Sequence, residues 1–189
     1  MRRACKVLAV AKGAEYHWQL DDNITRFIYR VDRLIRSRDV GAIFRCVEDF
    51  VCAHDGIAIA ALAFLVFSNT KKTDLGWNQG CYCSVFVRNA GAYTWRDVLN
   101  GVEDADYSLQ VLSSGECTLV FNRLIQGKIP TERVRGGMTE FYRAGGRERS
   151  YRVLAEAWRV PLRTMKDGRL NFVWNGVWSR FRQRPRSRV

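Results

Sequence analysis

The chain has 189 residues, 47% of them hydrophobic, which is enough to bury the core of one domain or of two small ones. No stretch approaches the roughly 18–20 uninterrupted apolar residues that span a bilayer, so the sequence predicts no transmembrane segment. The six cysteines come without the layout of a secretory signal, and this favours reduced thiols over disulfides.

The formal net charge of +12 is concentrated at the two ends of the chain. Residues 1–39 carry nine Lys and Arg against five Asp and Glu, residues 40–144 carry ten against eleven, and residues 145–189 carry twelve against three. A near-neutral body with basic ends is typical of a protein that binds a polyanion. We expect nucleic acid as the partner, with an anionic membrane or an acidic protein surface as the alternatives.

The first third of the chain predicts helices. Residues 1–20 are expected to form a basic N-terminal arm, which is also compatible with an organelle-targeting segment. Apolar residues recur at helical spacing over residues 24–35 and 40–51, and they predict a helical hairpin with Asp39 as the N-cap of its second helix. The run GIAIAALAFLVFSN, residues 56–69, is apolar nearly all round and predicts a buried core helix.

The remainder of the chain continues this pattern. Residues 69–80 predict a loop, residues 81–89 fit either a strand or a short helix, and five later segments predict helices: 94–99, 113–127, 130–145, 151–158 and 170–181. The predicted fold class is therefore mainly α, an array of helical hairpins that forms a short α-solenoid-like unit or an irregular bundle, with a basic extended C-terminal tail. The predicted organisation is a basic arm at 1–20, a single α-helical domain at 21–181 that could break at 69–92, and an Arg-rich tail at 182–189.

Residues 23–69 carry a resemblance to a known type of repeat. Apolar residues flank a short polar break and a polar turn, and an Ala/Leu-rich segment follows: Ile35, Ser37-Arg38-Asp39, Ile43, Phe44, Val47, His54-Asp55, Ile59, Ala60, Leu62, Ala63 and Leu65. This order resembles the organellar helical-repeat RNA-binding proteins of the octotricopeptide-repeat and Fas-activated serine/threonine kinase-like repeat type. The Pro-Pro-Pro-Glu-Trp signature and the appended nuclease-like module of those proteins are missing. The resemblance implies organellar RNA binding.

The sequence contains no established catalytic motif. It lacks G-x-x-x-x-G-K-[ST], G-x-G-x-x-G and H-E-x-x-H, which are the usual signals of nucleotide hydrolysis, dinucleotide binding and zinc proteolysis. Cys52 beside His54 could form a nucleophile pair, although a structural role is favoured. Glu103, Asp104 and Asp106 could hold Mg²⁺, but they equally fit the first turn of a helix. We therefore expect neither an enzyme nor a bound cofactor.

Four residues could assemble a zinc site. Cys52, His54, Cys81 and Cys83 supply the correct ligand types, but the paired C-x-x-C spacing of structural zinc sites is missing. Ordinary buried cysteines are the favoured interpretation, and we expect no metal.

The C-terminal run WSRFRQRPRSRV places an arginine at every second position. In an extended chain this spacing puts the guanidinium groups on one edge, where they can grip phosphates, and Pro185 disfavours a helix there. Trp174, Trp178 and Phe181 could stack on exposed bases, although a core role is favoured. The predicted RNA-binding residues are Arg2, Arg3, Arg147, Arg149, Arg152, Arg169, Arg180, Arg182, Arg184, Arg186 and Arg188.

These observations predict a non-catalytic RNA-binding structural protein. The expected partners are RNA, in particular rRNA, and the neighbouring proteins of a large ribonucleoprotein, and the expected setting is a ribosome in the mitochondrial matrix. A viral RNA-binding nucleocapsid or coat protein and a supernumerary subunit of a mitochondrial membrane complex are the alternatives.

Overall fold

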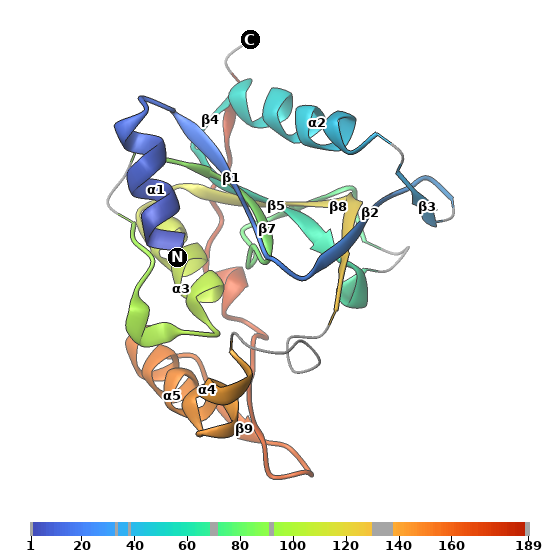
Figure 1. Cartoon of the computed structure of the whole chain (residues 1–189). Coiled ribbons are helices and arrows are strands. Elements are labelled where there is room, and N and C mark those ends of the chain that lie inside the picture. Colours follow the sequence, from blue (N-terminus) through green and yellow to red (C-terminus); the bar gives the residue numbers. More distant parts are fainter. Residues whose placement is uncertain are drawn as a thin grey trace.

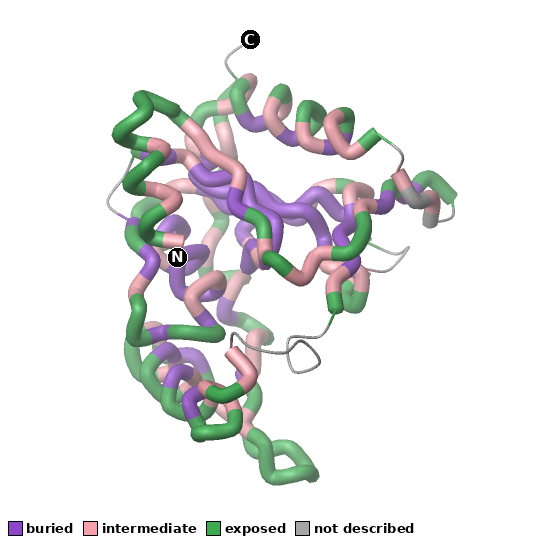
Figure 2. The backbone as a smooth tube through the Cα atoms, in the orientation of Figure 1, coloured by how far each residue is buried: buried purple, intermediate pink, exposed green. Residues whose placement is uncertain are grey.

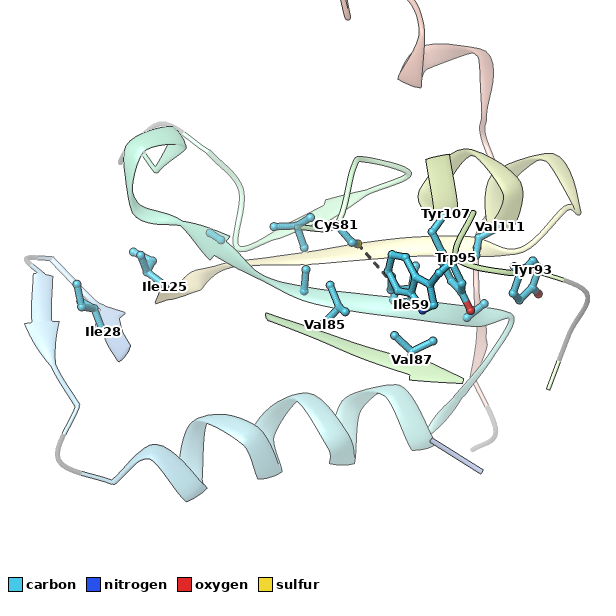
Figure 3. Packing of buried hydrophobic residues seen from close by; sticks show 14 residues of the cluster. Ile28, Ile59, Cys81, Val85, Val87, Tyr93, Trp95, Tyr107, Val111 and Ile125 are labelled. Carbon is cyan, nitrogen blue, oxygen red and sulfur yellow. Dashed lines mark hydrogen bonds between the residues drawn. The ribbon is translucent and has the colours of Figure 1, made fainter. Parts of the chain in front are cut away.

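A computed structural model describes residues 2–32, 34–37, 39–68, 72–90, 93–129 and 138–187 of the chain. Helix α2 lies along one face of a mixed sheet and helix α3 lies along the other (Figures 1 and 3). The predicted fold class, mainly α with an array of helical hairpins, is therefore wrong, because the centre of the molecule is a sheet.

Within the described ranges, seven strands form the main sheet. They are β1 (Tyr16–Leu20), β2 (Ile24–Arg30), β3 (Leu34–Arg36), β5 (Ile57–Phe64), β6 (Leu75–Trp77), β7 (Ser84–Arg88) and β8 (Cys117–Lys128). Their order is β1-β7-β5-β8-β2-β3, and β6 pairs with β8 beside this path. The central strands β5 and β8 are parallel, whereas the other pairs are antiparallel.

The other elements surround this sheet. The helices are α1 (Arg2–Ala11), α2 (Val40–Cys52), α3 (Glu103–Ser113), α4 (Thr139–Arg143) and α5 (Gly146–Trp158), and the short 3₁₀ turns are η1 (Leu65–Phe67), η2 (Asp97–Leu99) and η4 (Trp178–Arg180). Among the described residues, β9 (Leu162–Thr164) pairs with β10 (Leu170–Phe172), and β4 (His54–Asp55) pairs with β11 (Arg186–Ser187). None of the helices in the described ranges is long and apolar enough to cross a bilayer.

Helix α2 confirms the predicted helix over residues 40–51. The Asp39 side chain accepts a hydrogen bond from the backbone N–H of Ala42 at 2.9 Å, which is the expected N-cap. Ile43, Val47 and Val51 are buried against the sheet. The i, i+4, i+8 spacing therefore reports the buried face of this helix correctly.

Strand β5 replaces the predicted core helix of residues 56–69. Ala60 and Leu62 pack in the cluster beneath α2, whereas Ile59, Ala61 and Ala63 pack in the cluster beneath α3. A strand that is buried on both faces has no polar positions, so its sequence is continuously apolar and cannot be told from a buried helix by periodicity. Figure 2 shows this strand in the buried centre of the molecule.

Other predicted helices are also strands. Residues 113–127 form most of β8, residues 24–35 form β2 and the start of β3, and residues 170–181 form β10 and the short turn η4. The predicted loop at 69–80 contains β6, and the segment at 81–89 contains β7. Residues 130–137 of the predicted helix 130–145 lie outside the described residues, and α4 follows them.

Residues 1–20 contain α1 and the edge strand β1, which pairs with β7 from Tyr16↔Arg88 to Leu20↔Ser84. The predicted C-terminal tail runs back along the body. The Asn78 side chain donates to the Gln183 carbonyl at 3.0 Å, and the Gln183 side chain donates to the Leu112 carbonyl at 2.8 Å. The six cysteines are free.

Helix α3 joins the sheet to the C-terminal elements. On one side Tyr107 packs under the sheet, stacked on Trp95 with ring centroids 4.3 Å apart (Figure 3). On the other side Leu109 packs with Leu154 of α5 and with Val177 in a separate apolar cluster. The C-terminal segment is therefore held against the same helix that covers the sheet.

Candidate functional site

A cavity of about 660 Å³ lies where the ends of β1 and β8 and the start of α3 meet the C-terminal segment. Its volume is within the range of about 300–1,000 Å³ that is usual for small-molecule sites. One wall is charged and comes from the first 128 residues, and the other wall is aromatic and comes from residues 142–178.

The charged wall is centred on Asp21, the residue after β1. One carboxylate oxygen accepts from the Arg2 guanidinium at 2.6 Å and the other accepts from the Lys128 ammonium at 2.8 Å. Arg2 also pairs with Asp104 and lies 3.7 Å from Glu103, both in the first turn of α3. Three elements that are distant in the sequence therefore converge on one network of charges.

Cys83 stands behind this network in a strained backbone conformation. Its φ of 69° lies in the left-handed region, which a cysteine rarely adopts, and its carbonyl accepts from the Asp21 N–H at 3.1 Å. Burial raises the pKa of the Cys83 thiol to about 11, and the Lys128 ammonium lies 3.3 Å from its sulfur.

Lys128 retains its charge in this position. Burial opposes the ammonium, but the neighbouring Cys83 and Asp21 groups outweigh burial and raise the pKa of Lys128.

Asp22 and Asn23 extend the charged wall into the cavity. Within the described part of the chain, no hydrogen bond or ion pair engages the Asp22 carboxylate. The Asn23 amide nitrogen donates to the Ile129 carbonyl at 2.8 Å, while its side-chain oxygen is buried and has no hydrogen-bond partner among the described residues. Both residues therefore offer oxygen atoms to a ligand.

The aromatic wall is a series of four neighbouring rings. The ring centroids are 4.3 Å apart from Tyr151 to Phe172, 4.9 Å from Phe172 to Trp174 and 4.8 Å from Trp174 to Trp178. Phe172 is buried and the other three are half-buried. All four line the cavity.

A second cavity of about 650 Å³ adjoins the first and shares three lining residues with it. Arg143, Arg147 and Arg169 line it, and the Arg147 guanidinium lies 4.3 Å from the centre of the Tyr142 ring. The Arg169 side chain also pairs with Asp167 at 2.6 Å. This second cavity is therefore basic where it continues from the first.

The arginines predicted to bind RNA do not form one surface. Arg2 belongs to the charged wall, Arg3 is exposed on α1, Arg147 and Arg169 line the second cavity, and Arg149 and Arg152 are exposed on α5. Arg180 lies on η4, Arg182, Arg184 and Arg186 are exposed along the tail, and Arg188 lies outside the described residues. Figure 1 places the tail beside α2, at the opposite end of the molecule from α5.

The candidate metal ligands are not brought together. Among the described residues, no group of three or more His, Cys, Asp or Glu side chains is arranged to hold a metal ion. Cys52 is exposed whereas Cys81 and Cys83 are buried. Glu103, Asp104 and Asp106 begin a helix, but only the first two reach the cavity, because Asp106 is buried in contact with Arg96.

The sequence interpretation missed Asp21, Asp22 and Lys128. The signal for the first two is an acidic pair directly after a short segment, YHWQL, which is typical of a strand, because side chains at strand ends commonly line sites. Lys128 had no such signal, since the end of β8 was predicted to be the end of a helix.

The model of one protein family, described as TET-associated glycosyltransferase, matches residues 1–137. The match includes the whole charged wall and ends before α4. It overturns the resemblance to organellar helical-repeat proteins and the prediction of a non-catalytic RNA-binding ribosomal protein, and it supports neither the viral nor the membrane-complex alternative. It also overturns the expectation that the chain is no enzyme, because the family is named for a catalytic activity. No curated protein and no solved structure matches the chain. The chain belongs to the TET-associated glycosyltransferase family.

Proposed function

We propose that the chain transfers a sugar from a phosphate-activated donor, and that the 660 Å³ cavity is its donor site. The observation that carries this proposal is the placement of Arg2 and Lys128 on one wall of a cavity whose volume is usual for small-molecule sites. Cationic groups at this position stabilise the charge that develops on a departing phosphate. The family match covers both residues.

The reaction is a displacement at the sugar. The acceptor oxygen forms a bond to the anomeric carbon, the bond from that carbon to the phosphate oxygen breaks, and the phosphate departs with the electron pair. The acceptor hydroxyl gives its proton to a carboxylate, and we assign this role to Asp22 because its oxygens are not engaged within the described residues. Arg2 and Lys128 then stabilise the phosphate that has left.

The acceptor that we propose is a phosphate-rich polymer, namely a nucleic acid. The second cavity continues from the first and is lined by Arg143, Arg147 and Arg169. One guanidinium group can donate two hydrogen bonds to the oxygens of one phosphate, and such contacts position a nucleic-acid strand without reading its sequence. A strand bound there would present a hydroxyl to the donor site through the shared residues Tyr142, Tyr151 and Asn171.

The donor site is tested by calorimetry with uridine, guanosine and adenosine diphosphates. Lys128→Met is expected to weaken the Kd of the diphosphate that binds best by roughly 10- to 100-fold, because a charge-assisted hydrogen bond contributes about 1.5–3 kcal/mol. Lys12→Met is the matched control, because Lys12 is exposed just beyond α1 and does not line the cavity. Equal Kd values for both variants would contradict the proposal.

Asp22→Asn tests whether Asp22 contributes to the transfer reaction without contributing to diphosphate binding. Its diphosphate Kd is expected to stay within about threefold of the wild type, because the Asp21–Arg2–Lys128 network is untouched. Release of nucleoside diphosphate from the matching nucleotide sugar, measured with an oligonucleotide acceptor, is expected to fall by roughly 100-fold or more. If Asp22→Asn keeps the turnover of the wild type, Asp22 is not the group that accepts the proton.

A further inference from the structure

The aromatic wall lies outside the part of the chain that carries the family match. Tyr151, Phe172, Trp174 and Trp178 all follow residue 137, where the match ends. The charged residues of the opposite wall, Arg2, Asp21 and Lys128, all precede it. The cavity is therefore completed by a C-terminal segment that contributes aromatic side chains, whereas the family-matched part contributes charged ones.

The two tryptophans line the cavity as a stacked pair. Their rings are stacked at 4.8 Å with an angle of 17° between their planes, and both are half-buried while they line the cavity. Each is also packed in part against the apolar cluster that contains Leu154 and Val177. This backing fixes the rings, so a ligand that stacks on them need not order them first.

A ligand that fits both walls must have a flat apolar part and a charged part. The flat part requires an extended π-face, and the charged part requires phosphate oxygens that can reach Arg2 and Lys128. A nucleotide has this composition, since its base stacks on aromatic side chains while its phosphates bind cations. A free sugar lacks the π-face, and an uncharged apolar ligand would make no ionic contact with Arg2 or Lys128, both of which already pair with Asp21.

We propose that Trp174 and Trp178 form the stacking platform for a nucleobase in this cavity. The proposal rests on the proposed function, because it treats the cavity as the site of glycosyl transfer. The base can belong to the nucleotide of the donor or to the nucleic-acid acceptor, and both supply the same planar heterocycle. The C-terminal segment thus adds base recognition to a site whose charges lie in the family-matched part.

The first test uses calorimetry on Trp174→Leu with three probes: the best-binding nucleoside diphosphate, pyrophosphate and a single-stranded oligonucleotide. Stacking of one base contributes about 1–3 kcal/mol, so the Kd of the probe whose base uses the platform is expected to weaken roughly 5- to 100-fold. Pyrophosphate, which has no base, is expected to bind as it does to the wild type. Trp174→Phe, which keeps an aromatic face, is expected to retain most of the affinity.

Trp77→Leu is the matched control, because Trp77 is half-buried on β6 in the other apolar cluster and does not line the cavity. Weakening confined to the diphosphate places the base of the donor on the platform, and weakening confined to the oligonucleotide places the base of the acceptor there. Unchanged affinity for both probes in Trp174→Leu overturns the platform, while weakened diphosphate binding in Lys128→Met would still support the donor site.

A second test needs no substitution in the aromatic wall. The wild-type protein is expected to bind the nucleoside monophosphate of the best diphosphate at least about fivefold more tightly than ribose 5-phosphate, because only the former carries a base. Equal affinities for the two ligands would overturn a base platform for the donor even if Trp174→Leu failed to fold. A thermal melt of each variant separates loss of stacking from loss of structure.

Discussion

At the scale of single residues, the site depends on groups that are held in unusual states. Asp21 accepts from two cations at once, and Cys83 adopts a left-handed backbone that orients its carbonyl toward the Asp21 N–H. Strain of this kind persists where the surrounding structure enforces it, and functional sites are common among such places. Asp21 directly follows β1 and Cys83 directly precedes β7, at the end of their pairing. The strained residue therefore lies next to the charged wall.

The lowered pKa of His17 predicts how the free energy of unfolding depends on pH. Burial lowers the pKa of His17 below its ordinary value of 6.5, with a smaller contribution from Lys6, although a hydrogen bond with Asn89 at 2.6 Å opposes the shift. The unfolded chain therefore binds a proton at His17 more readily than the folded chain does. As the pH falls through 6.5, the free energy of unfolding is expected to decrease.

The measurement is urea unfolding between pH 7.5 and pH 5 of the wild type and of His17→Gln. Because Gln does not titrate, the decrease is expected to be smaller in the variant, and the difference between the two curves is the contribution of His17. Parallel curves for the two proteins would show that His17 titrates alike in the folded and unfolded chains.

At the scale of elements, α3 is the joint between the sheet and the C-terminal segment. Its first turn supplies Glu103 and Asp104 to the charged wall, and Asp106, fully buried, ties it to α5. The Asp106 carboxylate accepts from the Trp158 indole at 2.7 Å, from Gln110 at 2.7 Å and from Arg96 at 2.8 Å. The aromatic wall is thus held to the charged wall through one helix.

Asp106→Asn tests this joint. The variant loses the charge that compensates Arg96 and replaces an acceptor oxygen by an N–H₂ group, so the free energy of unfolding is expected to fall by about 3 kcal/mol. Asp167→Asn is the control, because its pair with Arg169 is exposed and such pairs contribute about 0–1 kcal/mol. Urea denaturation at pH 7 measures both, and equal losses would show that Asp106 does not hold the elements together.

At the scale of the whole molecule, the basic C-terminal third is divided between two places. Arg143, Arg147 and Arg169 line the second cavity beside the donor site, whereas Arg184 and Arg186 lie on the tail that runs toward β4. In Figure 1 these two regions lie at opposite ends of the molecule. A strand that reaches the donor site would therefore use the first group.

The double variant Arg143→Glu with Arg147→Glu tests this division. Its Kd for a single-stranded oligonucleotide is expected to weaken at least about tenfold, and its salt dependence is expected to become less steep, because fewer counterions are released. Arg149→Glu with Arg152→Glu makes the same charge change on exposed positions of α5 that do not line the cavity, and it is expected to have the smaller effect. If both double variants bind equally, the second cavity is not the acceptor site.

Part of the local structure could be predicted from the sequence, namely two of the helices. Helix α2 with its Asp39 cap and the helical segment around Tyr151 to Trp158 were predicted from apolar spacing, because these helices bury one face and leave the other to solvent. The acidic cluster at residues 103–106 was left open between a Mg²⁺ site and the first turn of a helix, and α3 begins there. Amphipathic helices carry this information in their own residues.

By itself the sequence determined two one-sided helices, α2 and the segment from Tyr151 to Trp158, and the accumulation of charge at the ends of the chain. Only the tertiary structure decided that residues 57–64 and 117–128 are strands, because a segment buried on both faces shows no alternation, and the strand partners of Ala60 are the distant residues Phe86 and Leu119. The folded sheet brings Lys128 to Asp21, and the packing of the C-terminal segment on α3 brings Trp174 into the same cavity. The site could not be predicted from the sequence, because each wall comes from segments that meet only in the folded chain.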